Sequence, residues 1–173
     1  MNYGGLRFCD VANGPGCRVT LFVSGCRIHC KNCFNKEAQS FTYGEKFTHE
    51  VLEKIIREAD KNWVTGLTVL GGEPMDVDNQ PTVAEIVSTF RRMFPDKTIW
   101  VYTGYVLEKD LDPGRPMYTK YTPCILDNID ALVDGPFIEE QKDISLRFRG
   151  SRNQRIIHFR DGHVVEVEKW EGK

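Results

Sequence analysis

Short apolar runs alternate along this chain with longer segments in which apolar residues recur every three or four positions. Four of the short segments are rich in β-branched residues and lead into turns that contain glycine, a pattern typical of buried strands. They are residues 17–23, 66–74, 97–105 and 129–136. We therefore predict four strands whose carboxyl ends each open into a turn.

Two longer segments predict amphipathic helices between these strands. In residues 48–60 the apolar positions lie on one helical face behind a threonine that can cap the helix. Residues 81–94 show the same spacing and begin with a proline, which is favoured in the first helical turn. Near the C-terminus, Asp161-Gly162 joins two alternating runs, which predicts an antiparallel β-hairpin.

The alternation of strands and helices predicts an α/β fold with mostly parallel strands. Four or five such units are too few for a closed eight-stranded barrel, which typically needs about 250 residues. The chain has 173 residues and no linker rich in Gly, Ser or Pro. We therefore predict one domain over residues 1–173, a partial, open βα barrel followed by the C-terminal β-hairpin.

Three cysteines lie within eight residues, in the loop after the first predicted strand. Cys26, Cys30 and Cys33 are spaced C-x3-C-x2-C. Structural zinc usually has four closed ligands, and iron–sulfur clusters are usually held by four thiolates. Three thiolates would leave one metal position open, which distinguishes a catalytic metal from a structural one. Folding could instead supply a fourth ligand. The candidates are His29, Cys9, Cys17 and Cys124.

Composition narrows the classes of function. The charged residues are 23 Lys or Arg and 25 Asp or Glu, a net charge of −2, so there is no general basis for binding nucleic acid. No apolar run is long enough to span a membrane, and the first residues lack the pattern of a signal peptide. We therefore expect a cytoplasmic protein. In that reducing compartment, six cysteines favour metal or redox chemistry over disulfides.

The cysteine spacing after a strand resembles the signature of radical S-adenosylmethionine enzymes. The resemblance implies that Cys26, Cys30 and Cys33 hold a 4Fe–4S cluster. It also implies that the amino and carboxylate groups of S-adenosylmethionine chelate the open iron. Many members carry an aromatic residue before the third cysteine, beside the adenine. Here Asn32 takes that position and the aromatic is Phe34, so the adenine is held by stacking or by backbone contacts from residues 32–34.

A second motif of that family is a GGE-type turn at the end of the next strand, matched here by Gly71-Gly72-Glu73. The resemblance implies that this turn contacts the methionine amino group. Glycines let a backbone approach a ligand closely, and exposed carbonyls suit an ammonium group. Thr103 and Asp134 end later strands on the ligand side, where they could contact the ribose or the carboxylate of the cofactor.

Longer segments resemble one subgroup, the activases of anaerobic ribonucleotide reductases. They are NGPGCRVTLFVSGC, CFN, DKTIWVYTGY, LVDGPF and RGSRNQRIIH, within about residues 1–158. The resemblance implies that a one-electron donor such as flavodoxin reduces the cluster and that S-adenosylmethionine is cleaved to a 5′-deoxyadenosyl radical. That radical would then generate a glycyl radical on the large reductase subunit. The basic stretch from Arg147 to Arg160 either lines the docking face or forms a solvated loop.

Two alternatives stay open at this point. One is an activase of another glycyl-radical enzyme, or an enzyme that modifies a small molecule. The other is a non-enzymatic metal-binding or electron-transfer module, which would require a fourth protein ligand. Outside a metal site, Cys9, Cys17 and Cys124 are expected to be packing residues.

Overall fold

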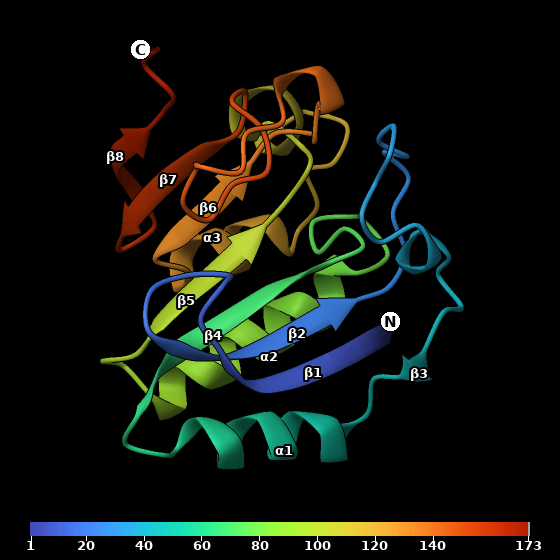
Figure 1. Ribbon diagram of the computed structural model, residues 1–173. Helices are drawn as coiled ribbons and strands as arrows, with labels where there is room; N and C mark the ends of the chain where they lie inside the picture. Colours follow the sequence, from blue (N-terminus) through green and yellow to red (C-terminus); the bar gives the residue numbers. More distant parts are fainter. Residues whose placement is uncertain (173) are drawn as a thin grey trace.

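The computed structural model describes residues 1–172, which form one mixed sheet with helices on it (Figure 1). Neighbouring strands pair in the order β3-β1-β2-β4-β5-β6-β7-β8. The strands are β1 (Asn2–Asp10), β2 (Cys17–Val23), β3 (Glu45–Lys46), β4 (Val64–Gly71), β5 (Thr98–Tyr102), β6 (Ala131–Asp134), β7 (Arg155–Arg160) and β8 (His163–Glu168). The α-helices are α1 (His49–Ala59), α2 (Gln80–Met93) and α3 (Thr122–Asn128). Shorter helical turns lie at Glu37–Gln39, Leu107–Leu111 and Glu139–Gln141.

The elements predicted from periodicity are confirmed. β2, β5 and β6 lie within their predicted strand segments, and β4 overlaps its segment but begins two residues earlier, at Val64. α1 lies within its helical segment, α2 begins one residue before its segment, and β7 and β8 form the C-terminal hairpin. The pattern missed β1, β3 and α3. β1 contains Gly4-Gly5 and no continuous apolar run, and α3 is only seven residues long with a proline in its first turn. Both therefore lack a clear periodic signal.

The prediction of mostly parallel strands is wrong. Only the pairs β2–β4, β4–β5 and β5–β6 are parallel, and the other four pairings are antiparallel. A short loop joins β1 directly to β2, and so short a connection can only join antiparallel neighbours. Among the described residues the sheet ends at β3 and β8, so its ladder is open. The α/β class is confirmed, with parallel strands confined to the centre of the sheet.

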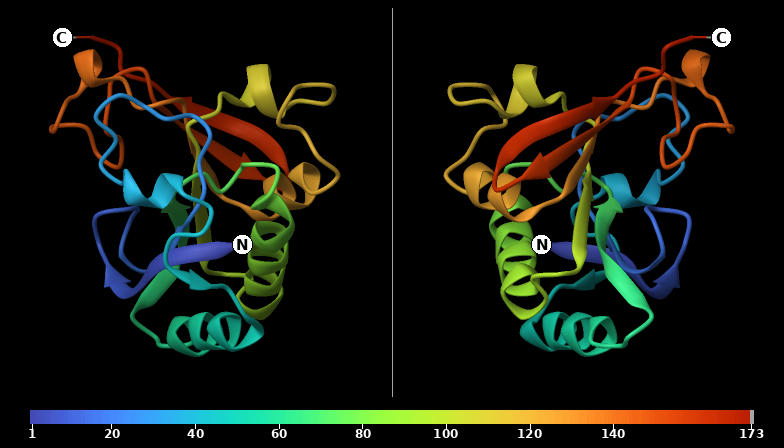
Figure 2. Two further views of the ribbon diagram at one scale, coloured as in Figure 1. Left: turned by 90° about the vertical axis from the view of Figure 1, so that its right-hand side faces the viewer. Right: turned by 90° about the vertical axis from the view of Figure 1, so that its left-hand side faces the viewer.

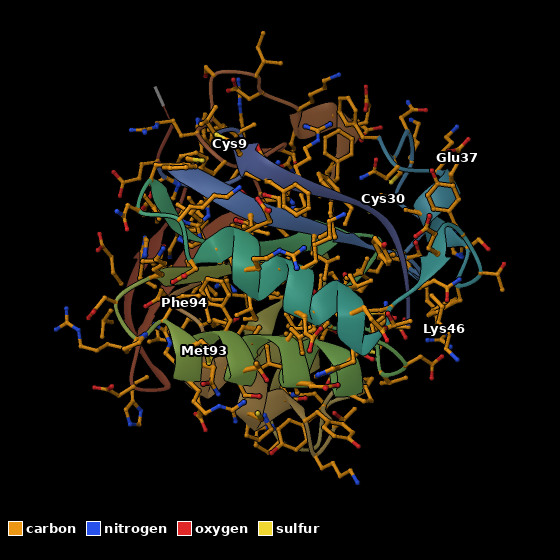
Figure 3. The ribbon with its side chains drawn as sticks, turned by 90° about the horizontal axis from the view of Figure 1, so that it is seen from below. Cys9, Cys30, Glu37, Lys46, Met93 and Phe94 are labelled. Carbon is orange, nitrogen blue, oxygen red and sulfur yellow. The ribbon has the colours of Figure 1, made fainter. Side chains whose placement is uncertain are left out.

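The α-helices pack on one face of the sheet, as Figures 2 and 3 show. Alternate residues of β2, such as Val19 and Leu21, are completely buried and belong to this core. Ile55 of α1, Phe90 of α2 and Ile125 of α3 join the same cluster. The buried face of the sheet is therefore the one that the helices cover. None of the helices in residues 1–172 is long and apolar enough to cross a membrane.

The opposite face of the parallel strands carries a buried arginine. Arg18 of β2 donates from Nε to Thr68 Oγ1 (2.7 Å) and from its terminal nitrogens to Thr98 Oγ1 (2.9 Å) and the Leu67 carbonyl (2.7 Å). Its guanidinium also lies over the Trp100 ring, 5.8 Å from the centroid. Burial lowers the pKa of Arg18 to about 10. The side chain thus joins β2, β4 and β5 near their amino ends, remote from the cysteine loop.

The carboxyl ends of the parallel strands point toward one end of the sheet, where long loops gather (Figure 1). The loop after β2 holds the three cysteines, the turn after β4 holds the two glycines, and the segments after β5 and β6 lie beside them. Open α/β sheets bind ligands beyond the carboxyl ends of their strands. The topology therefore brings the predicted motifs together.

Candidate functional site

The cysteine loop begins where β2 ends. Cys26, Cys30 and Cys33 are free thiols and each is partly exposed. The backbone turns sharply at His29 and Asn32, which have φ values of 51° and 55°. The Cys33 N–H donates to the Cys30 carbonyl at 3.2 Å, which closes a turn around Asn32. These turns fold a short segment back on itself, so the three thiols stay in one small region.

The backbone around two of the thiols favours negative charge on sulfur. Burial raises the pKa of the Cys26 thiol to about 11, and the backbone N–H groups of Ile28 and His29 act in the opposite direction. Burial also raises the pKa of Cys30, whose sulfur receives the N–H of Phe137. N–H groups directed at sulfur are the contacts that tune iron–sulfur clusters. The surroundings therefore suit thiolate ligands once a metal offsets the cost of burial.

The donor chemistry fits an iron–sulfur cluster, although the side chains do not yet converge. In residues 1–172, no three His, Cys, Asp or Glu side chains are grouped as metal ligands. The three thiols are nevertheless free and lie on one loop. Cluster binding would require these side chains to rotate toward one point.

The candidate fourth ligands lie elsewhere or are engaged. His29 Nδ1 is 3.0 Å from Gln39 Oε1, and Cys124 lies on α3, next to Asn128. Cys9 and Cys17 lie at the opposite end of the β1–β2 hairpin, and Figure 3 shows Cys9 well separated from Cys30. β2 alone separates the two ends by roughly 20 Å, at about 3.3 Å per residue. The described part of the chain thus offers three thiol ligands at this site.

The glycine turn after β4 packs directly against the start of the cysteine loop. The Gly72 N–H donates to the Val23 carbonyl at 2.7 Å, and the Glu73 N–H donates to the Gly25 carbonyl at 2.8 Å. A Cβ at position 72 would lie 2.6 Å from the Gly25 oxygen and 2.7 Å from the Ala38 oxygen. Only glycine fits here, so the two motifs form a single backbone unit.

Asn79 fastens this unit and was not predicted. Its side chain is buried, and Nδ2 donates to the carbonyls of Ser24 (3.0 Å), Gly25 (3.3 Å) and Glu73 (2.9 Å). One amide therefore holds both the cysteine loop and the GGE turn. An asparagine just before a helix is common as a cap, so the sequence carries no signal of this role.

Arg27 anchors the cysteine loop from the other side and was also missed. Its guanidinium pairs with Asp76, whose side chain is completely buried, and with Asp78 at 2.5 Å. It also lies 4.5 Å from the centroid of the Phe41 ring. The loop is thus tied to the segment between β4 and α2.

Glu73 is held inside the protein. Its Oε1 accepts from Thr103 Oγ1 (2.7 Å) and the Met75 N–H (2.9 Å), while Oε2 accepts from the Gly104 N–H (2.7 Å). Burial raises the pKa of Glu73 to about 7, although the three donors oppose that shift. The carboxyl group thus links the end of β4 to the end of β5.

A hollow of about 280 Å³ lies between the cysteine loop and the strand ends. Four of the predicted site residues line it. They are Phe34, Gly71, Gly72 and Thr103. Tyr102 and Phe137 add aromatic surface to its wall. Phe34 is 83% exposed, and its ring lies edge-on to that of Phe137 with centroids 6.4 Å apart. This hollow is the space in which a small molecule could contact both motifs.

The other predicted residues lie outside the lining of that hollow. Asn32 forms the left-handed turn before Cys33, and Cys33 lines an adjoining depression with Phe34. Asp134 is buried, and its carboxylate accepts from Arg155 Nε (2.9 Å) and the Leu107 N–H (3.0 Å). Cofactor contacts from Asn32 and Asp134 stay predictions, and Asp134 already has strong partners within the chain.

Comparison with known proteins identifies the family of the chain. A family model described as "4Fe-4S single cluster domain" matches residues 12–157 of the chain. The chain therefore belongs to the 4Fe–4S single-cluster class of proteins. A relative from Vibrio cholerae is 42% identical over 92% of this chain and 99% of its own length. Relatives from Escherichia coli (strain K12) and Enterobacteria phage T4 are 38% and 35% identical, over 92% and 94% of this chain and 100% and 97% of their own.

All three relatives are named anaerobic ribonucleoside-triphosphate reductase-activating protein. The chain belongs to the family of anaerobic ribonucleoside-triphosphate reductase-activating proteins. The family predicted from the sequence is thereby confirmed.

Proposed function

We propose that this chain activates an anaerobic ribonucleotide reductase by generating a glycyl radical on its large subunit. The observation that carries the proposal is that the loop with three free thiols is hydrogen-bonded at its start to the Gly71-Gly72 turn, and that this turn and Phe34 of the loop line one hollow. The relatives' shared name supports the reductase as the target. A small electron-transfer protein such as flavodoxin would be the one-electron donor.

In this proposal Cys26, Cys30 and Cys33 hold a 4Fe–4S cluster with one open position, and the hollow receives S-adenosylmethionine. When bound, the cluster would supply the electron that cleaves S-adenosylmethionine to the 5′-deoxyadenosyl radical, which takes a hydrogen atom from the reductase glycine. The protein's own contribution is to position the cofactor and to exclude water.

The contacts around the hollow assign roles to the chain's own residues. Gly71 and Gly72 let the backbone approach the methionine amino group, since no side chain stands between them and the hollow. Phe34 offers a ring face or edge to the adenine, with Asn32 and Cys33 contributing backbone contacts. Glu73 holds Thr103 in place at the wall, so we assign Glu73 a positioning role.

The mixed sheet serves this chemistry as a partial, open barrel. Its open edge leaves the hollow accessible to a loop of a large protein, as the transfer of a hydrogen atom from a reductase glycine requires. The arginine stretch is less free for docking than its charge suggests. Arg152 pairs with Asp143, and Arg155 pairs with Asp134 and Glu108.

The deciding experiment measures 5′-deoxyadenosine and the glycyl radical together. The chain is reconstituted anaerobically with iron and sulfide, reduced with dithionite, and given S-adenosylmethionine and the large reductase subunit. We expect 5′-deoxyadenosine by chromatography and a glycyl radical by electron paramagnetic resonance. Cys30→Ala should give neither, whereas the matched control Cys124→Ala should retain both.

Two results would contradict the proposal. The first is an intact cluster with no 5′-deoxyadenosine in the presence of the reductase. The second is cleavage that leaves no radical on the reductase, which would redirect the search to another glycyl-radical enzyme or a small-molecule substrate.

A further inference from the structure

Two cysteines that do not belong to the cluster loop meet at the other end of the β1–β2 hairpin. The thiol of Cys17 donates to Cys9 Sγ, with the two sulfur atoms 2.7 Å apart. Both are free thiols, Cys9 exposed and Cys17 partly buried. Packing alone, the expectation for scattered cysteines, does not explain two sulfurs in direct contact near the surface.

The pairing of β1 with β2 creates this contact. The register shifts by a bulge between Arg7 and Asp10, so the residues around Cys9 fall opposite the start of β2. The connecting loop then turns back through Gly14 and Gly16, both with positive φ. A Cβ at position 16 would come within 2.4 Å of the Thr65 hydroxyl, so the loop is closely packed where it meets β4.

We propose that Cys9 and Cys17 form a reversible intramolecular disulfide, a redox site separate from the cluster ligands. The sulfurs need to move only from 2.7 Å to the length of a disulfide bond, about 2.05 Å. The pair lies on adjacent antiparallel strands, and a short loop already closes the ring between them. The oxidant is a low-molecular-weight disulfide.

The exchange balances in two steps. In the first step the exposed Cys9 loses its proton to solvent, and its thiolate attacks one sulfur of the oxidant's S–S bond. That bond breaks, one thiolate leaves, and Cys9 forms a mixed disulfide with the other half of the oxidant. Cys17 then loses its proton and attacks the Cys9 sulfur, which forms the Cys9–Cys17 bond and expels the second thiolate. The two cysteines lose two electrons and two protons, and the oxidant gains the two electrons. Cys9 attacks first because it is exposed, whereas Cys17 is partly buried. Burial and the neighbouring Cys9 also raise the pKa of the Cys17 thiol to about 11, so less of it is thiolate.

The loop closed by this pair packs against β4 and against Arg18, on the face of the sheet opposite the helices. The Pro15 carbonyl accepts from Arg18 (3.2 Å) and from the Thr65 hydroxyl (3.0 Å), and the Asn13 carbonyl accepts from Thr68 Oγ1 (2.8 Å). A disulfide would therefore fasten the segment that holds the buried Arg18. Oxidation at this end of the molecule would leave the cluster thiols untouched.

A single peptide reports the reaction. The full chain, reconstituted anaerobically, is exposed to oxidised glutathione, its remaining thiols are alkylated, and it is digested with trypsin. Cleavage after Arg7 and Arg18 releases residues 8–18, which contain both cysteines and no others. We expect this peptide to be two hydrogens lighter and free of alkyl groups. Without the oxidant it should carry two alkyl groups.

Matched variants separate the fold from chance exchange. Cys124→Ser should behave as the wild type, and Cys9→Ser should never yield the lighter peptide. The disulfide should form several-fold faster in the folded chain than in concentrated urea. A peptide that stays doubly alkylated, a stable glutathione adduct on Cys9, or equal rates with and without urea would overturn the proposal.

Discussion

At the scale of single residues, the glycines of the site are required by their neighbours. A Cβ at Gly72 would meet two backbone carbonyl oxygens, which cannot rotate away as a flexible side chain could. Gly71 has a φ of +114° and lies against the backbone of Val23. The sequence predicted that these glycines let the backbone approach a ligand. In the structure they let the end of β4 approach the backbone of the cysteine loop.

Replacing Gly72 by alanine should disturb both stability and cluster binding. The added methyl group must push the Gly25 or Ala38 backbone aside, and overpacking of this kind costs about 1–3 kcal/mol. The free energy of unfolding in urea should fall by that amount, and bound iron and sulfide per chain should decrease. Gly5→Ala is the control, because a Cβ there meets nothing within 4 Å. Equal iron content in both variants would show that the two motifs are not coupled.

The buried carboxyl of Glu73 should make stability depend on pH. Its pKa is raised by burial to about 7 in the folded chain, against an ordinary value of 4.5. Between these two values the folded state binds more protons than the unfolded state, so the free energy of unfolding falls as pH rises from about 4.5 to about 7. Below about pH 4.5 the carboxyl group is protonated in both states, so it adds no pH dependence to the free energy of unfolding.

The test compares the wild type with Glu73→Gln, which cannot titrate, by urea unfolding across that range of pH. The wild type should lose stability relative to the variant as pH rises, with no further change above about pH 8. Parallel curves for the two proteins would contradict the prediction.

At the scale of elements, Asp134 and Arg155 join the end of β6 to the start of β7. Asp134 is 1% exposed and accepts two hydrogen bonds from Arg155, which also reaches Glu108 beyond the sheet. This contact fixes where the antiparallel part of the sheet meets the parallel part. It places a predicted cofactor residue in a structural role.

Asp134→Asn should therefore destabilise the fold more than it affects cofactor binding. Removing one partner of a buried ion pair costs about 3–5 kcal/mol, and the loss here should fall at the lower end because Glu108 still pairs with Arg155. Urea unfolding measures the change. Glu140→Gln removes an exposed pair with Lys31 and should leave stability unchanged. Unchanged stability of Asp134→Asn with weaker S-adenosylmethionine binding would favour a cofactor contact instead.

At the scale of the whole molecule, the three-cysteine loop and β8 lie apart. β8 pairs only with β7, and most of its side chains are exposed. The cysteine loop lies beyond the carboxyl ends of the parallel strands (Figure 1). β8 should therefore contribute stability without shaping the site.

A chain ending at Arg160 tests this separation. It loses the ladder of β8 and the contact between His158 and Glu168, so its melting temperature should fall. Bound iron and sulfide per chain should match the full-length protein. A chain ending at Glu168 keeps β8 and serves as the control. Loss of cluster binding in the shorter chain alone would show that β8 supports the site from a distance.

The sequence by itself determined the local features of this protein. The spacing of Cys26, Cys30 and Cys33, the Gly71-Gly72 turn, the two helices and the C-terminal hairpin all depend on residues close in the chain. Periodicity and turn chemistry act over a few residues, and so they are visible without a structure. The family resemblance rests on the same local motifs.

Only the tertiary structure decided the contacts between distant segments. The buried amide of Asn79, the anchoring of Arg27 by Asp76, and the partners of Asp134 join residues 20 or more positions apart. β1 took its place beside β2 without a periodic signal, and that pairing brought Cys9 to Cys17. Such contacts depend on strand order and register, which a local pattern does not encode because the same strands could pair in other orders.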